Sequence, residues 1–254
     1  MDSGVRSPLI DFFRRGEVAR DVRLVAAQGA FAPRALDQLA LLLILKDDPD
    51  PEIAREAAST LDRLPEAALS AFLGRSEVPI DMRAFFVSRG VQVSAAAESA
   101  DDPLIDAVDE EPDAGDDSNV GVSERLAKMS VLEKMKAAMR GTREERAILV
   151  RDPNRLVAAA VLSSPKLTGQ EVEAIAKMAN VGEEVLRVIG TNRQWTKNYG
   201  VVAGLVRNPK TPVAISLTLL QRINDKDVRV LATDRNIPEP IRIAARKRAT
   251  ASRT

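Results

Sequence analysis

The segment TNRQWTKNYG (191–200) holds the only tryptophan and the only tyrosine of the chain. Basic residues alternate with these rings, since Arg193 precedes Trp195 and Lys197 lies between Trp195 and Tyr199. Aromatic faces beside cations can stack on nucleic-acid bases or guanidinium groups, and they also form hot spots of protein interfaces. A large ring in an aliphatic core can equally fill a gap between helices. Two interpretations therefore stay open, a binding surface and a packing wedge.

Basic residues also recur in the loops between the helices that we predict for the C-terminal half. Equivalent loop positions of a repeat array stack along one edge, so these cations predict a basic ridge. Such a ridge could bind phosphate groups, an acidic protein or the chain's own acidic segment. The alternative is a solvated edge, or arginines bonded to helix-end carbonyls of the adjacent repeat. The residues are Arg151, Lys166, Arg193, Arg207, Lys210 and Arg235.

Residues 241–254, IRIAARKRATASRT, form a further basic run. Cations are favourable in the last turn of a helix, and a polar outer face suits a terminal repeat. The alternative is a segment that binds nucleic acid or a membrane surface, although its mostly alanine apolar face disfavours the membrane. The four cations of its helical part are Arg242, Arg246, Lys247 and Arg248.

The composition excludes several kinds of catalytic site. The chain has no cysteine and no histidine, which excludes Ser-His and Cys-His catalysis and zinc sites built from these residues. Three groups of carboxylates fall at predicted turns or helix starts, where acids stabilise the helix dipole. We therefore expect no catalytic residue, metal or cofactor, and a protein that is not an enzyme. The groups are Asp47/Asp48/Asp50, Glu171/Glu173 and Glu183/Glu184.

The longest apolar runs, 39–45 and 156–162, have seven residues each, whereas a bilayer span needs about 20. The first residues are charged and lack the apolar core of a signal peptide. We expect a cytoplasmic protein that does not enter membranes.

Charge is segregated along the chain, although 37 basic and 37 acidic residues balance overall. Residues 96–120 hold 10 acidic residues and no basic one, whereas residues 121–254 hold 25 basic and 13 acidic residues. High net charge with Pro, Gly and Ser is typical of disorder, so we predict an acidic linker over 95–122. This linker is a solvated spacer, an intramolecular competitor that lies on the basic C-terminal block, or a short docking motif.

The C-terminal half contains an internal repeat. LVRDPNRLV (149–157) recurs as LVRNPKTPV (205–213), and VAAAVLSSPK (157–166) aligns with VVAGLVRNPK (201–210) at an offset of 44 residues. Proline ends the preceding helix and suits the first turn of the next one, while Asp or Asn can cap that next helix. In the N-terminal half, DDPDP precedes Ile53, Ala57 and Leu61 at a helical spacing. We find no strand alternation.

These motifs resemble known helical repeats. DPDPEIAREAASTL resembles the turn and second helix of a HEAT repeat. VRNPKTPVAISLTLLQRINDKDVRVLATDRNIPEPIRIAA resembles the leucine-rich-repeat-variant pattern, and residues 132–248 are similar to functionally uncharacterised bacterial helical-repeat proteins. The resemblance covers roughly 70% of the chain and implies a binding scaffold.

We therefore predict an all-α solenoid of short HEAT-like helix pairs in two blocks, 8–94 and 123–249, joined by the acidic linker. The leading functional hypothesis is a non-catalytic scaffold that binds a protein partner through its inner helices or basic loop edge. The alternative is nucleic-acid binding by residues 123–249.

Overall fold

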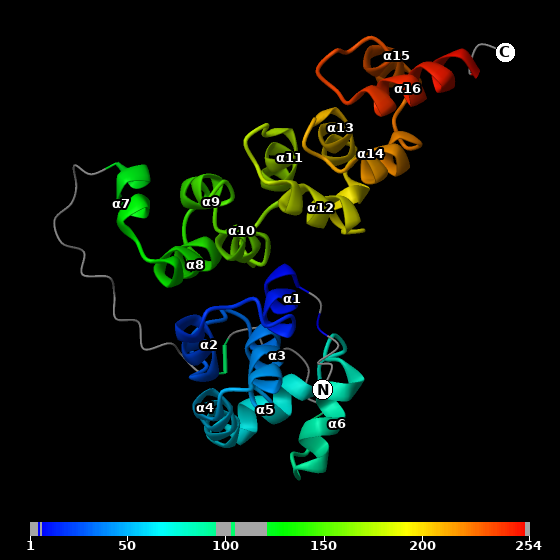
Figure 1. Ribbon diagram of the computed structural model, residues 1–254. Helices are drawn as coiled ribbons and strands as arrows, with labels where there is room; N and C mark the ends of the chain where they lie inside the picture. The colour runs from blue at the N-terminus through cyan, green and yellow to red at the C-terminus, as the bar shows by residue number, and fades with distance from the viewer. Residues whose placement is uncertain (1–4, 6, 95–102, 105–120, 252–254) are drawn as a thin grey trace. The chain divides into compact units, whose positions relative to one another are not determined.

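The computed structural model describes residue 5 and residues 7–94, 103–104 and 121–251 (Figure 1). In these residues the chain forms 16 α-helices and one short 3₁₀-helix, and no strand. The prediction of an all-α fold is thus confirmed for the described part of the chain. Residues 95–102 and 105–120, most of the predicted linker, lie outside the described residues.

The chain folds into two compact units. One comprises Met1–Arg140 with Ser163–Pro165, and the other comprises Gly141–Leu162 with Lys166–Thr254. The limits that the sequence suggests for the two blocks stay a prediction.

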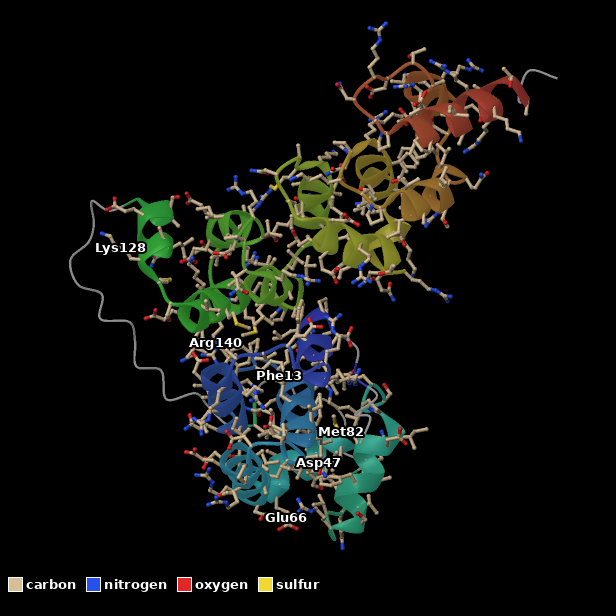
Figure 2. The ribbon with its side chains drawn as sticks, viewed as in Figure 1. Phe13, Asp47, Glu66, Met82, Lys128 and Arg140 are labelled. Carbon is tan, nitrogen blue, oxygen red and sulfur yellow. The ribbon has the colours of Figure 1, made fainter. Side chains whose placement is uncertain are left out.

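The first unit is built around a helix that is buried on almost all sides. Helix α3 (Ala35–Leu45) packs against α1 (Pro8–Arg14), α2 (Arg20–Ala27) and α4 (Pro51–Asp62). Leu39, Leu42 and Leu43 have no exposed surface, and Phe13 and Met82 belong to the same buried set (Figure 2). The unit's other helices are α5 (Glu66–Leu73), α6 (Ile80–Ser88), α7 (Val122–Lys128) and α8 (Val131–Arg140).

The DDPDP junction starts α4 as the sequence predicts. The side chain of Asp50 accepts a hydrogen bond from the backbone N–H of Glu52 at 3.0 Å, and Pro51 occupies the first helical position. Arg23 and Arg20, from α2, pair with Asp48 and Asp50. The positions at helical spacing, Ile53, Ala57 and Leu61, are all buried.

The second unit is a series of short helices that contact their near neighbours in sequence. In Figure 1, α9, α11 and α13 follow one another in one row, and α10, α12 and α14 in a second row. Each helix from α9 to α14 packs against the next one or the next but one. The helices are α9 (Arg143–Leu149), α10 (Arg155–Leu162), α11 (Gly169–Lys177), α12 (Glu183–Thr191), α13 (Tyr199–Arg207), α14 (Val213–Leu220), α15 (Asp225–Leu231) and α16 (Glu239–Ala251), with the 3₁₀-helix η1 (Trp195–Lys197) between α12 and α13.

Asp and Asn residues make the same turn after three helices of this unit, α9, α12 and α13. The Oδ1 atoms of Asp152, Asn192 and Asn208 each accept the backbone N–H two residues on, at 2.8–3.0 Å. This arrangement is an Asx turn, which redirects the chain without backbone strain. After α15, Asp234 forms the same turn by accepting the backbone N–H of Asn236. The expectation that these residues cap the next helix is wrong for Asn208, because α14 begins after Pro212 without a side-chain cap.

A buried ion pair joins α9 to α11. Thr142 and Glu145 form a capping box at the start of α9, and Thr168 and Glu171 form a second one at the start of α11. The second box also binds Arg146, whose Nη2 lies 2.7 Å from Glu171 Oε1, with both side chains 6–7% exposed. Arg146 additionally donates to the carbonyls of Gly141 and Lys166, so each nitrogen of its buried guanidinium makes at least one hydrogen bond.

Candidate functional site

Small residues on one face of α13 form the floor of a hollow. Gly200, Ala203 and Gly204 stand three and four positions apart, which places them on the same side of the helix. A Cβ on Gly204 would lie 3.2 Å from the side chains of Ala176 and Lys177, and one on Gly200 would overlap the carboxylate of Glu173. The glycines therefore allow α11 and α13 to approach closely.

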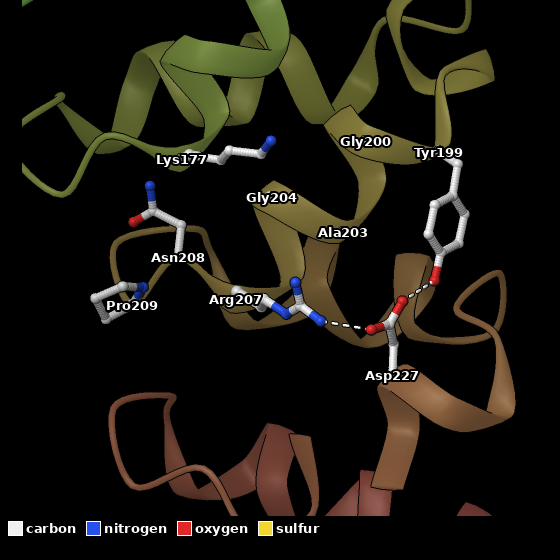
Figure 3. Close-up of a pocket in the computed structure, with 9 residues that line it drawn as sticks. All are labelled: Lys177, Tyr199, Gly200, Ala203, Gly204, Arg207, Asn208, Pro209 and Asp227. Carbon is white, nitrogen blue, oxygen red and sulfur yellow. Dashed lines mark hydrogen bonds and ion pairs between the residues drawn. The ribbon is translucent and has the colours of Figure 1, made fainter. Parts of the chain in front are cut away.

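The hollow above this floor has a volume of about 460 Å³ and is open to solvent. Three helices supply its charged walls: Lys177 ends α11, Arg207 ends α13, and Asp227 lies in the first turn of α15 (Figure 3). Tyr199 forms one side, and Asn208 and Pro209 form the other. An apolar floor with charged ends suits an extended chain that carries an acidic group.

Asp227 is the centre of the hydrogen bonds on one wall. Its carboxylate accepts hydrogen bonds from the hydroxyl of Tyr199, from a guanidinium nitrogen of Arg207 at 2.6 Å and from the side-chain amide of Asn224 at 3.1 Å. The hydrogen bond from Tyr199, together with the charge of Arg207, holds the pKa of Asp227 below its usual value. Burial and the same carboxylate raise the pKa of Tyr199. The wall thus presents a neutral phenol and an ionised carboxylate.

A second group of polar side chains lines the α11 side. Lys177 Nζ lies 2.7 Å from Glu173 Oε1, and Asn198 donates to the other oxygen of Glu173 at 3.4 Å. The hydrogen bond and charge of Lys177 lower the pKa of Glu173. Asn198 also caps α13 by accepting the N–H of Gly200 at 2.7 Å. Both cations that border the hollow therefore hold partly exposed carboxylates that a ligand can replace.

The predicted aromatic segment is divided by the structure. Tyr199 lines the hollow, whereas Trp195 is half-buried in η1 and Lys197 donates to Gln194 at 3.1 Å. Among the described residues, no cation stacks on Trp195 or Tyr199. The cation–π pairs in this part of the chain all involve phenylalanines of the first unit. Arg193 is exposed in the loop before η1.

The predicted loop cations are all exposed, and they have different partners. Arg207 lines the hollow and pairs with Asp227, and Arg151 donates to the carbonyl of Ala147 at 2.9 Å in the helix that precedes it, α9. Lys166 supplies the carbonyl that accepts from Arg146. Arg235 lines a different hollow, and Lys210 lies just beyond the first one. Whether these cations act together as one ridge stays a prediction.

Sequence reasoning missed several residues of the hollow. Lys177 looks like an ordinary surface residue in its helix, and Asp227 lies in a repeat motif without any sign of a binding role. A signal was present in the glycines of YGVVAGLVR, because Gly200 and Gly204 are four positions apart in a helix that otherwise consists of good core residues. In the described part of the chain, no three acidic side chains gather where they could hold a metal ion.

Comparisons with protein-family models, with curated proteins and with solved structures found no match for this chain. The described helices include none that combines the length and the apolar character needed to cross a membrane.

Proposed function

We propose that the chain is a non-catalytic helical-repeat scaffold, in which α9–α16 form an α-solenoid and bind a protein partner. The hollow between α11, α13 and α15 is the proposed contact site, with the exposed loop cations beside it as its rim. The partner contributes an extended segment that carries at least one carboxylate.

The observation that carries this proposal is the combination of a small-residue floor with two cations at its ends. Gly200 and Gly204 allow α11 to pack close to α13, and together with Ala203 they line the hollow without large side chains. Lys177 and Arg207 border the same opening from different helices, which gives an acidic side chain two charged donors.

The ion pairs now present do not oppose this binding strongly. The side chains of Lys177 and Arg207 are about half exposed, at 58% and 46%. Exposed pairs of this kind contribute only about 0.2–1 kcal/mol, so an incoming carboxylate can displace Glu173 or Asp227 at small cost.

The test uses the full chain and two labelled ten-residue peptides, one alternating Glu with Ser and the other alternating Lys with Ser. We expect the acidic peptide to bind and the basic one not to bind, as measured by fluorescence anisotropy. Lys177→Gln should weaken the acidic peptide several-fold, and Ala203→Leu should weaken it by filling the floor of the hollow.

Lys226→Gln is the matched control, because Lys226 is an exposed cation of the same unit that does not line the hollow. Equal weakening by Lys177→Gln and Lys226→Gln would mean that general charge, not the hollow, attracts the peptide. Unchanged binding in Ala203→Leu would also contradict the proposal.

Nucleic-acid binding by residues 123–249 is the second candidate, and the excess of basic residues over 121–254 favours it. Binding to a single-stranded oligonucleotide should then fall steeply as salt rises, because several counterions are released. Charge reversal at Arg207 and Lys210 should abolish it. A competition experiment separates the two candidates, because the acidic peptide has the negative charge of a nucleic acid but no bases. If an oligonucleotide does not displace the bound acidic peptide, the protein-binding candidate is favoured.

A further hypothesis is that the acidic linker binds the basic block of the same chain. Most of it lies outside the described residues, but Leu104 is described, and its N–H donates to the buried side chain of Gln38 at 2.8 Å in the first unit. If the linker competes for the basic edge, deletion of 96–120 should tighten binding of the acidic peptide at low salt. Unchanged affinity would remove this idea.

A further inference from the structure

A second hollow in the α9–α16 unit is lined by three arginines. It has a volume of about 470 Å³, and its lining consists of Thr233 and Arg235 from the loop after α15 and Arg242 and Arg246 from α16. Arg242 and Arg246 are four positions apart, so they share one face of their helix and both border the same opening.

The arginines keep much of their hydrogen-bonding capacity. Arg235 has no hydrogen bond or ion pair within the described part of the chain. The Nε of Arg246 donates to the carbonyl of Ala232 at 2.8 Å, which fixes the side chain. The two terminal nitrogens of Arg246 take no part in this hydrogen bond. Arg242 pairs only loosely with Glu239, at 3.8 Å.

Three positively charged side chains border this one opening. Like charges four positions apart on a helix repel each other, and a third arginine at the same opening adds to the repulsion. The nearest acids compensate little, because Glu239 is 72% exposed and Asp234 uses one oxygen to hold the backbone of Asn236. Thr233 adds a hydroxyl at the same place, whose proton is donated to Val230 O at 3.0 Å and whose oxygen can accept.

We propose that this arginine hollow, formed by Thr233, Arg235, Arg242 and Arg246, binds a phosphomonoester group carried by a serine or threonine of a protein. A monoester presents three terminal oxygens and close to two negative charges at pH 7, which matches three guanidinium groups around one opening. A nucleic-acid backbone carries one charge per phosphate and needs cations spaced along a track, whereas these cations converge on a single hollow. The site shares no residue with the α11–α13–α15 hollow, so it does not depend on the function proposed there.

The test measures anisotropy of the full chain with a labelled Gly/Ser peptide that holds one phosphoserine, and with its unphosphorylated form. The phosphopeptide should bind at least about tenfold more tightly, since a hydrogen bond to a charged group is worth that factor or more. Arg235→Gln should remove most of this preference without affecting the fold, because the side chain has no partner among the described residues. Arg229→Gln, an exposed arginine of α15 outside the hollow, is the matched control and should have little effect.

The pH dependence adds a second measurement. A phosphomonoester gains its second charge near pH 6, so affinity should rise between pH 5 and 7.5. The chain has no histidine, the side chain whose ordinary pKa falls in this range, and the three arginines stay charged throughout. Equal binding of both peptides, equal loss in the two arginine variants, or an affinity that does not change with pH would overturn the proposal. Preferential binding of an oligonucleotide without a terminal phosphate would overturn it in favour of nucleic acid.

Discussion

At the scale of single residues, the sequence predicts local partners and misses distant ones. The spacing of Thr142 and Glu145 predicts a capping box, and the structure contains it. Thr168 and Glu171 have the same spacing, which indicates a second capping box at the start of α11 and no further contact of Glu171. Nothing local indicates that Glu171 also pairs with Arg146, because that contact spans 25 residues and depends on how α9 packs against α11.

The buried pair makes a prediction about acid stability. Burial tends to raise the pKa of Glu171, but the hydrogen bonds from Thr168 and Arg146 outweigh it and the pKa is lowered. The ionised carboxylate therefore contributes its full stabilisation above about pH 4.3, the usual value for Glu, and loses it as the pH falls through the lower value in the folded state. Glu171→Gln should cost about 3 kcal/mol at pH 7, because Arg146 keeps its buried charge without a counter-ion.

Urea unfolding at a series of pH values from 7 to 3 checks this prediction. The difference in unfolding free energy between the wild type and Glu171→Gln should shrink towards pH 3. Glu144→Gln changes an exposed carboxylate of α9, the helix that holds Arg146, and should differ from the wild type by less than about 0.5 kcal/mol at every pH. A gap between Glu171→Gln and the wild type that stays constant with pH would show that packing, not charge, is lost.

At the scale of elements, the sequence predicts the Asx turns as breaks between helices, but it does not reveal their wider role. Asn208 ends α13, and its side-chain amide donates to the carbonyls of Ala176 and Met178, both at 2.9 Å. The side chain thus satisfies the last carbonyls of α11, which have no partner within that helix.

Helix α14 shows another limit of the sequence pattern. VAISLTLL is apolar nearly all round, so its pattern does not reveal that Leu220 is buried while Val213 and Leu217 are 38% and 37% exposed.

Asn208 therefore carries a prediction for the junction of α11 and α13. Asn208→Ala removes three hydrogen bonds at a position that is 4% exposed, and should cost about 2 kcal/mol of unfolding free energy. Asn208→Asp keeps the acceptor for Lys210 but turns a carboxylate oxygen towards two carbonyls, so it should cost more than the alanine. Thermal unfolding of both variants measures which one is less stable. An aspartate variant that is more stable than the alanine variant would contradict this account.

At the scale of the whole molecule, the helical class could be predicted and the hollows could not. Proline and Asx residues at recurring intervals, few aromatics and no alternating pattern indicate short packed helices. The first hollow combines residues from helices that are far apart in sequence, such as Lys177 and Asp227, and no local spacing connects these residues. The arginine hollow joins the loop after α15 to the helix that follows it, α16.

The packing of α9–α16 predicts a gradient of local stability. Helices of the middle, such as α11 and α13, have packed neighbours before and after them, whereas α15 and α16 pack on fewer elements. In such a series local opening is easiest at the ends. Amide hydrogen exchange should therefore be slowest in α11–α13 and faster in α15–α16, and uniform protection across all of these helices would contradict a repeat array.

The wall of the first hollow also joins two helices mechanically. Asp227, in α15, is joined to Tyr199 and Arg207, in α13, by exposed polar contacts. High ionic strength weakens such contacts and leaves the apolar core intact. If the proposed partner draws Arg207 away from Asp227, it also releases one of the contacts that hold α15 to α13. We therefore expect binding of the partner and widening of the entrance to occur together.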